Sequence, residues 1–177
     1  MKKTLFVLMM CAMCILTACE KHDGIDYFKA KCVAELNGQT FIDQTPFTIS
    51  PNAIITPSLE LYDNSLRFTT YLRPERNGQI AYAIKIFIYA DDMDDLFDKE
   101  LKFEKLPDIE SSVEGDPSYF DYIRYCIQNK ISCAEVTGEI VESGSFKITS
   151  YDKEKHQYKG FFTLKFSEGT IKGKFDL

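Results

Sequence analysis

The chain has 177 residues, of which 27 are acidic and 21 are lysine or arginine, so its formal net charge is −6. An acidic chain without a strongly basic stretch repels nucleic acid, and we therefore expect no nucleic-acid partner. The length suits one domain with one hydrophobic core.

The N-terminus has the pattern of a secretory signal. Lys2 and Lys3 precede an apolar run over residues 5–16. A membrane-spanning helix needs roughly 20 apolar residues, so this run is too short to remain in a bilayer. A charged start, an apolar middle and small residues near the end are typical of a signal peptide that is removed.

The run ends in Leu16-Thr17-Ala18-Cys19, which matches a bacterial lipoprotein cleavage box. The match predicts a signal peptide over residues 1–18 and lipidation of the Cys19 thiol. A plain signal cut near Ala18 and a buried first helix are the alternatives. Because the lipidated cysteine of a bacterial lipoprotein carries two or three acyl chains, Cys19 should anchor the chain firmly in a membrane.

Residues 19–27 are polar and lack apolar periodicity, so we expect the lipidated cysteine to be followed by a flexible tether. Residues 28–177 should then form a single β-domain. The expected location is the cell envelope, lipid-anchored at the outer membrane, with the periplasmic and cell-surface faces both left open. Removal of Lys2 and Lys3 with the signal makes the formal charge of the mature chain −8 instead of −6.

The first strands are marked by alternation and turn residues. Residues 28–36 alternate between apolar and polar side chains, and Asn37-Gly38 after them is a strong hairpin signal, with the return over residues 39–42. An edge strand is expected near residues 47–49, inside a proline-rich stretch. Residues 59–62 and 66–72 should form a second hairpin.

Residues 79–90 predict a strand that is apolar on both faces, which indicates a central place in a sheet. The spacing then becomes helical over residues 91–101, where we expect the only helix. Residues 107–118, with two prolines and several acids, predict a loop.

Residues 119–128 and 131–137 are interpreted as a hairpin about Asn129-Lys130. This register would oppose Cys126 and Cys133, and it would also oppose Arg124 and Glu135. After removal of the signal and lipidation of Cys19, the remaining thiols are Cys32, Cys126 and Cys133. An odd number allows at most one internal bridge, and the hairpin makes a Cys126–Cys133 disulfide the candidate, with two thiols as the alternative.

Residues 145–149, 158–166 and 170–177 predict the last strands. A turn at residues 167–169 would set Phe166 opposite Ile171 and Phe162 opposite Phe175 on the core face. Lys165, Lys172, Thr163 and Lys174 would then face water. Nine or ten strands and one short helix predict a mostly β protein, an antiparallel β-sandwich or an open β-barrel.

Several segments carry a resemblance to a family. Residues 28–31 and 37–41 near the start, and residues 144–152, 160–163 and 173–177 near the end, resemble small Bacteroidota cell-envelope lipoproteins of unknown function. The resemblance covers the two ends of the mature chain. It implies a lipid-anchored β-sandwich in the envelope and supplies no catalytic residue.

The sequence contains few residue patterns that are typical of catalytic sites. Its histidines are His22, in the tether, and His156, in a polar turn, so a histidine-dependent hydrolase is not expected. Cys126 and Cys133 alone do not make a metal site, and we expect no metal and no cofactor. The acids of residues 91–98 could offer oxygens to calcium, although acids at a helix start are an adequate alternative.

One aromatic cluster is a candidate ligand platform, with the alternative that its members are core and rim residues of a strand. Exposed aromatics beside acids suit a sugar ring or a partner protein, although the absence of tryptophan weakens the carbohydrate interpretation. The cluster consists of Tyr119, Phe120, Tyr122 and Tyr125.

Three functions remain open. The first is a non-catalytic envelope module that binds a partner protein or a glycan, which makes the chain no enzyme. The second is a hydrolase that acts on envelope or dietary polysaccharide through paired carboxylates, and the third is a structural role in envelope assembly. The acids considered for the second function are Glu60, Glu104, Glu135 and Glu139.

Overall fold

The structure is a computed structural model, and it describes residues 31–43, 47–50, 53–55, 57–75, 78–97, 99–105, 125–152 and 154–177. The signal peptide, Cys19 and the tether predicted from the sequence lie outside the described residues, as does the predicted loop at 107–118. Among the described residues, no helix combines the length and the apolar composition that a membrane span needs.

One of the two main sheets has six antiparallel strands in the order β2-β1-β13-β12-β11-β8. Strands from the two ends of the described chain are neighbours in this sheet, since β1 near the start pairs with β13 at the end. The strands are β1 (Cys32–Leu36), β2 (Gln39–Asp43), β8 (Leu101–Glu104), β11 (Ser143–Asp152), β12 (Gln157–Phe166) and β13 (Gly169–Asp176).

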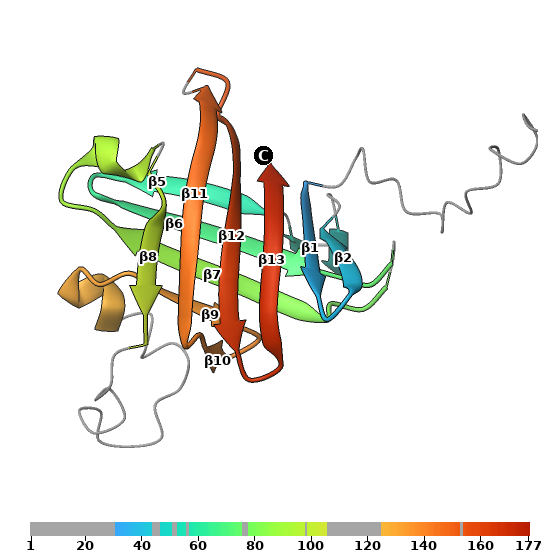
Figure 1. The fold of residues 1–177 in the computed structure, drawn as a ribbon. Coiled ribbons are helices and arrows are strands. Elements are labelled where there is room, and N and C mark those ends of the chain that lie inside the picture. Colours follow the sequence, from blue (N-terminus) through green and yellow to red (C-terminus); the bar gives the residue numbers. More distant parts are fainter. Residues whose placement is uncertain are drawn as a thin grey trace, which may run out of the picture.

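The other main sheet has five antiparallel strands in the order β10-β9-β7-β6-β5, and β3 and β4 form a separate two-stranded hairpin. In Figure 1 the strands of the six-stranded sheet run across those of the five-stranded sheet behind it. The two sheets are packed face to face without closing into a barrel, so the fold is a β-sandwich. The remaining strands are β3 (Phe47–Ser50), β4 (Ala53–Ile55), β5 (Ser58–Tyr62), β6 (Ser65–Leu72), β7 (Tyr82–Tyr89), β9 (Cys133–Val136) and β10 (Glu139–Ile140).

The early hairpins confirm the sequence predictions. Asn37 and Gly38 both have positive φ, 52° and 79°, as the tight turn between β1 and β2 requires. The expected edge strand at residues 47–49 is β3, which pairs with β4. β5 and β6 form the second hairpin, with Tyr62 opposite Ser65.

The predicted central strand is also confirmed. β7 is the middle strand of its sheet, paired with β6 on one side and β9 on the other. Ile84, Ile86 and Ile88 are fully buried between the sheets. Phe87 points to the opposite side of β7 and is buried as well, which explains why both phases of this strand are apolar.

Aromatic rings join the two sheets at the centre of the core. Phe68, on β6, lies 4.8 Å from Phe175, 5.5 Å from Phe146 and 5.6 Å from Phe162, measured between ring centroids. These three partners lie on β11, β12 and β13, so one ring of the five-stranded sheet contacts three strands of the six-stranded sheet. Such ring contacts add to the burial of apolar area.

The last hairpin forms with a register two residues away from the predicted one. Leu164 lies opposite Ile171, Phe162 opposite Gly173 and Gly160 opposite Phe175. A Cβ on Gly173 would stand 2.2 Å from the Phe162 ring, so each phenylalanine ring needs a glycine beside it. A shift of two residues keeps the same side chains inside, and the predicted core and water faces are therefore correct.

The predicted helix at residues 91–101 is wrong in extent. The structure has a short 3-10 helix, η2 (Met93–Leu96), and the chain then enters β8 at Leu101. The side chain of Asp92 accepts a hydrogen bond from the backbone N–H of Asp94 at 3.0 Å and begins the helical turn.

The predicted hairpin about Asn129-Lys130 is wrong, because residues 125–129 are helical. Lys130 has a φ of +57°, and the N–H of Ile131 donates to the carbonyl of Cys126 at 2.9 Å. This backbone hydrogen bond closes a six-residue loop that contains the left-handed residue Lys130, which is how many helices end. Asn129-Lys130 therefore acts as a helix cap instead of a strand turn. β9 pairs with β7 and β10, and Thr137-Gly138 forms the hairpin turn.

Candidate binding surface on the six-stranded sheet

Strand alternation gives the six-stranded sheet an inner face of apolar side chains and an outer face of polar ones. On β13, Ile171, Gly173 and Phe175 are buried, whereas Lys172 and Lys174 between them are exposed. The neighbouring strands follow the same rule because each pair is in register.

A row of polar side chains crosses this outer face from one edge strand to the other. Each member lies directly opposite the next on the neighbouring strand, through all six strands, and each is exposed or half-buried. At about 4.8 Å between strands, the row is about 24 Å long. We call it the cross-strand row, and its members are Thr40, Glu35, Lys172, Thr163, Ser145 and Lys102.

A second row lies beside the first and contains an aromatic ring. Phe161 on β12 is opposite Lys147 of β11 on one side and Lys174 of β13 on the other. Phe161 is half-buried, and Lys174 is exposed. An aromatic ring on the outer face is thus flanked by cationic side chains on both neighbouring strands.

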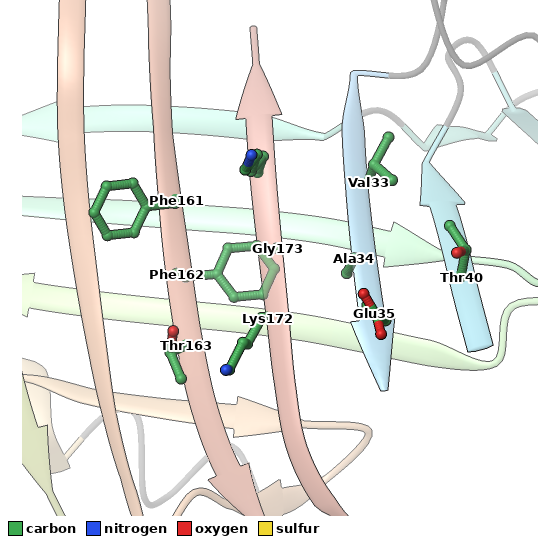
Figure 2. A pocket seen from close by; sticks show the side chains of 10 residues that line it. Val33, Ala34, Glu35, Thr40, Phe161, Phe162, Thr163, Lys172 and Gly173 are labelled. Carbon is green, nitrogen blue, oxygen red and sulfur yellow. The ribbon is translucent and has the colours of Figure 1, made fainter. Parts of the chain in front are cut away.

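The outer face is hollowed along the cross-strand row. One depression of about 430 Å³ lies over β2, β1, β13 and β12, and a second of about 250 Å³ lies toward β8. Thr163 lines both, so they adjoin at the middle of the row. Figure 2 shows the larger depression, with Phe161 and Thr163 on β12 and Lys172 on β13.

The lysines of this face differ in whether they have an acidic partner. Lys159 pairs with Asp176 at 2.7 Å and Lys165 pairs with Glu142 at 2.8 Å. The Glu142 carboxylate raises the pKa of Lys165 through this hydrogen bond. Lys165 also lines the smaller depression, so one lining lysine has an acidic partner. Within the described part of the chain, the recorded ion pairs include none of the other lysines that line or flank the depressions, which are Lys102, Lys147, Lys172 and Lys174.

The candidate aromatic platform does not lie on this face. Tyr119, Phe120 and Tyr122 are outside the described residues. Tyr125 is the first described residue of the helical segment and packs against a small cluster on the five-stranded sheet, so it is a rim residue of a packed cluster there.

That cluster also contains the two candidate disulfide cysteines. Cys126 and Cys133 are buried with Phe87 on the outer side of the five-stranded sheet, and all three cysteines of the β-domain are present as thiols. A hydrogen bond with Cys126 and burial together raise the pKa of the Cys133 thiol. The two cysteines are therefore neighbours, although a helix and a strand bring them together instead of the predicted hairpin. Their disulfide stays a prediction.

The candidate carboxylates are spread over the molecule. Glu60 accepts a hydrogen bond from the hydroxyl of Tyr62 at 2.7 Å, and Glu139 accepts bonds from the backbone N–H and hydroxyl of Ser167 at 2.6 Å. Glu104 lines the smaller depression together with Glu100. Of the four candidate acids, Glu60 lies on β5, Glu104 on β8, and Glu135 and Glu139 on the paired strands β9 and β10.

Glu135 is the candidate acid with the most unusual surroundings. Its side chain is 3% exposed, and it accepts a hydrogen bond from the N–H of Gly138 at 2.8 Å. It lies opposite Lys85 on β7, not opposite Arg124 as the predicted hairpin required. Burial raises its pKa to about 7, against the opposing effects of the Gly138 N–H and Lys85.

A buried polar cluster joins the sheets at one corner, and sequence analysis missed it. Asp43, at the end of β2, accepts hydrogen bonds from the hydroxyl of Thr70 at 2.8 Å and the N–H of Tyr71 at 2.6 Å. Arg73 lies 3.9 Å from the same carboxylate. Burial raises the pKa of the adjacent Cys32 thiol to about 12, which leaves it a poor nucleophile. The cluster holds β2 to β6 and serves the fold.

Within the described residues, no group of three or more histidine, cysteine or acidic side chains is arranged to hold a metal ion. The acids of residues 91–98 include Asp92, which caps η2, and Asp95, which pairs with Lys99. The calcium hypothesis stays a prediction for the chain as a whole.

The sequence matches no family model, no curated protein and no solved structure. The resemblance to envelope lipoproteins therefore stays a prediction. The candidate surface was missed because the lysines of the last strands were assigned only to a water-facing side. The alternation of apolar and polar residues in each strand shows which side chains face outward. The cross-strand row cannot be found from it, because the row depends on how strands distant in the sequence align.

Proposed function

We propose that the chain is a lipid-anchored protein of the cell envelope whose β-sandwich is a non-catalytic binding module for a glycan. The observation that carries this proposal is the cross-strand row, a hollowed line of polar side chains across all six strands of one sheet. The lipoprotein cleavage box at Cys19 supports the anchor.

The shape of the surface suits an extended polymer. A line of about 24 Å that runs from one edge strand of the sheet to the other can hold several successive units of a linear chain. Lysine ammonium groups donate hydrogen bonds, Glu35 accepts them, and the hydroxyls of Thr163 and Ser145 do both. Sugar hydroxyl groups need this mixture of donors and acceptors.

The same surface suits a protein partner less well. The centres of protein interfaces are apolar and poor in charged residues. Here the centre of the larger depression includes Lys172 and Glu35, and Phe161 and Val33 are its outward apolar side chains. A protein partner would have to bury these charges, whereas a hydrated glycan leaves them in contact with water.

The test is binding of the full-length protein in detergent to an array of neutral and acidic polysaccharides. Replacement of Thr163→Trp should fill the middle of the row and weaken binding at least tenfold. The matched control is Thr69→Trp, a half-buried threonine on β6 in the other sheet, which should leave binding unchanged. Absence of binding to every glycan, or an equal effect of the two substitutions, would overturn the proposal.

A further inference from the structure

The lysines of the binding surface allow the class of glycan to be named. We propose that the glycan is a linear polymer of acidic sugars, whose acid groups bind the lysines around Phe161 and along the cross-strand row. This inference rests on the proposed function, because it names the ligand of the same surface.

The first argument is the position of Phe161. Its ring stands between Lys147 and Lys174, each one strand away in direct register. The apolar face of a sugar ring can pack on the aromatic ring, and an acid group at the edge of that sugar then lies within reach of either ammonium. A neutral sugar would make the ring contact and leave both cations without a charged partner.

The second argument is the local charge. The whole chain has 27 acidic and 21 basic side chains, yet Lys147, Lys172 and Lys174 line or flank the larger depression and Glu35 is its one lining acid. The smaller depression is balanced, with Lys102 and Lys165 beside Glu100 and Glu104. Lys159, elsewhere on the same sheet, and Lys165, at the smaller depression, are paired with acids. Cations that line an open depression without an ion pair in the described part of the chain attract an anion from solution.

The third argument is spacing. Lys102 and Lys172 belong to the same row and are separated by three strand steps, or about 14 Å. Lys174 follows Lys172 on the same face of β13, about 7 Å further along the strand. A single small anion would occupy one of these positions, whereas a polymer with an acid group on successive sugars can use them all.

Glu35 makes the charge differ along the cross-strand row. It lies opposite Lys172 in the cross-strand row, on the side away from Lys102. A carboxylate there disfavours an acid group of the ligand and can accept hydrogen bonds from sugar hydroxyls instead. The cationic part of the surface therefore lies over β11 to β13, where Lys147, Lys172 and Lys174 stand. The part over β1 and β2, and the part toward β8 where Glu100 and Glu104 line the smaller depression, suit neutral sugars at the ends of the bound segment.

The test compares two polymers that share a backbone and differ in charge, polygalacturonate and its methyl ester. Titration calorimetry with the full-length protein in detergent should show binding of polygalacturonate, at least tenfold weaker binding of the ester, and loss of affinity with added salt. The double substitution Lys172→Gln with Lys174→Gln should weaken polygalacturonate binding at least tenfold. The control Lys155→Gln, an exposed lysine in the β11–β12 turn, should leave it unchanged.

The outcomes separate the two proposals. Equal binding of the two polymers, or binding only of neutral polysaccharides on the array, would overturn the acidic-sugar inference and leave glycan binding intact. Binding of polygalacturonate that the double substitution does not weaken would overturn this inference as well, because the lysines would not be the contacts. Absence of binding to any glycan would overturn both. Thermal unfolding of the variants checks that they are folded.

Discussion

Phe87 and Phe161 are both outward-pointing aromatic residues, one on each sheet of the sandwich, and their surroundings differ. Phe87 points outward from β7 and is 4% exposed, because Cys126 and Cys133 pack against it. Phe161 points outward from β12, remains half-buried and has lysines on both neighbouring strands. The difference teaches that, among the described residues, the chain covers one outer face at this point with its own side chains and leaves the other hollowed.

The comparison also explains why the two faces have different chemistry. Under the cover, Glu135 and two thiols are removed from water, so burial decides their pKa values. On the hollowed face, lysines and hydroxyls keep water contact and remain ready for a ligand. The covered face therefore contributes to stability, and we assign binding to the open one.

The largest expected effect comes from deletion of residues 171–177. This deletion removes most of β13, which lies between β1 and β12 and joins both parts of the six-stranded sheet. It also removes Phe175, one of the three rings that contact Phe68. We expect no cooperative thermal transition by circular dichroism, and a normal transition would contradict the central role of β13.

The second prediction tests the comparison directly. Phe87→Ala should lower the free energy of unfolding by about 3 kcal/mol, because it leaves a cavity under the helical segment. Phe161→Ala should lower it by less than about 1 kcal/mol, since the ring is only half-buried, and should weaken glycan binding instead. Urea denaturation of both variants measures the difference. Equal losses of stability would remove the distinction between the faces.

The third prediction concerns Glu135, whose folded pKa is raised from 4.5 to about 7. A raised pKa means that the folded state holds the proton more tightly than the unfolded state. The free energy of unfolding should therefore fall as the pH rises from about 4.5 to 7. Above that range Glu135 should cause no further change in it. The total fall is at most about 3 kcal/mol.

Glu135→Gln tests this pH dependence, because the amide oxygen can keep the bond to the N–H of Gly138. The variant should match the wild type at pH 4.5 and be more stable at pH 8, as measured by urea denaturation. Lys85 and Cys133 face the same carboxylate and are unchanged by the substitution. Parallel pH curves for the two proteins would contradict the prediction. Glu60→Gln, on the exposed surface, serves as the control.

The fourth prediction concerns the buried thiols of the covered face. Oxidised glutathione should convert Cys126 and Cys133 to a disulfide, with release of two molecules of reduced glutathione, while Cys32 remains a thiol. Burial should make the exchange slow. The short loop between the two cysteines gives an expected stabilisation of about 2 kcal/mol. Peptide mapping by mass spectrometry without reduction checks the pairing, and a bridge to Cys32 would contradict it.

Local patterns predicted much of the fold because they determine which side chains of a strand face the core. The alternation in β1, β7 and β13 was read correctly, and so was the Asn37-Gly38 turn. The register of the last hairpin was missed by two residues. Phase is a property of each strand, whereas register depends here on how the rings of Phe162 and Phe175 fit beside glycines of the partner strand.

The Asn129-Lys130 pair shows where local patterns fail. A residue with positive φ after asparagine fits a strand turn and a helix end equally well. The packing of Cys126 against Phe87 accompanies the helical choice, and this contact joins residues that are far apart in the sequence. The candidate surface was out of reach for the same reason, since its row needs all six strands in register.

The sequence by itself determined the lipoprotein box at Cys19 as a prediction, the β class of the domain and the inward or outward phase of its clearest strands, because each depends on neighbouring residues. Only the tertiary structure decided the sandwich, the cover over Phe87 and the row that ends at Thr40 and Lys102. Those features arise when strands from distant parts of the chain pair side by side, and the pairing is selected by the shape of the common core.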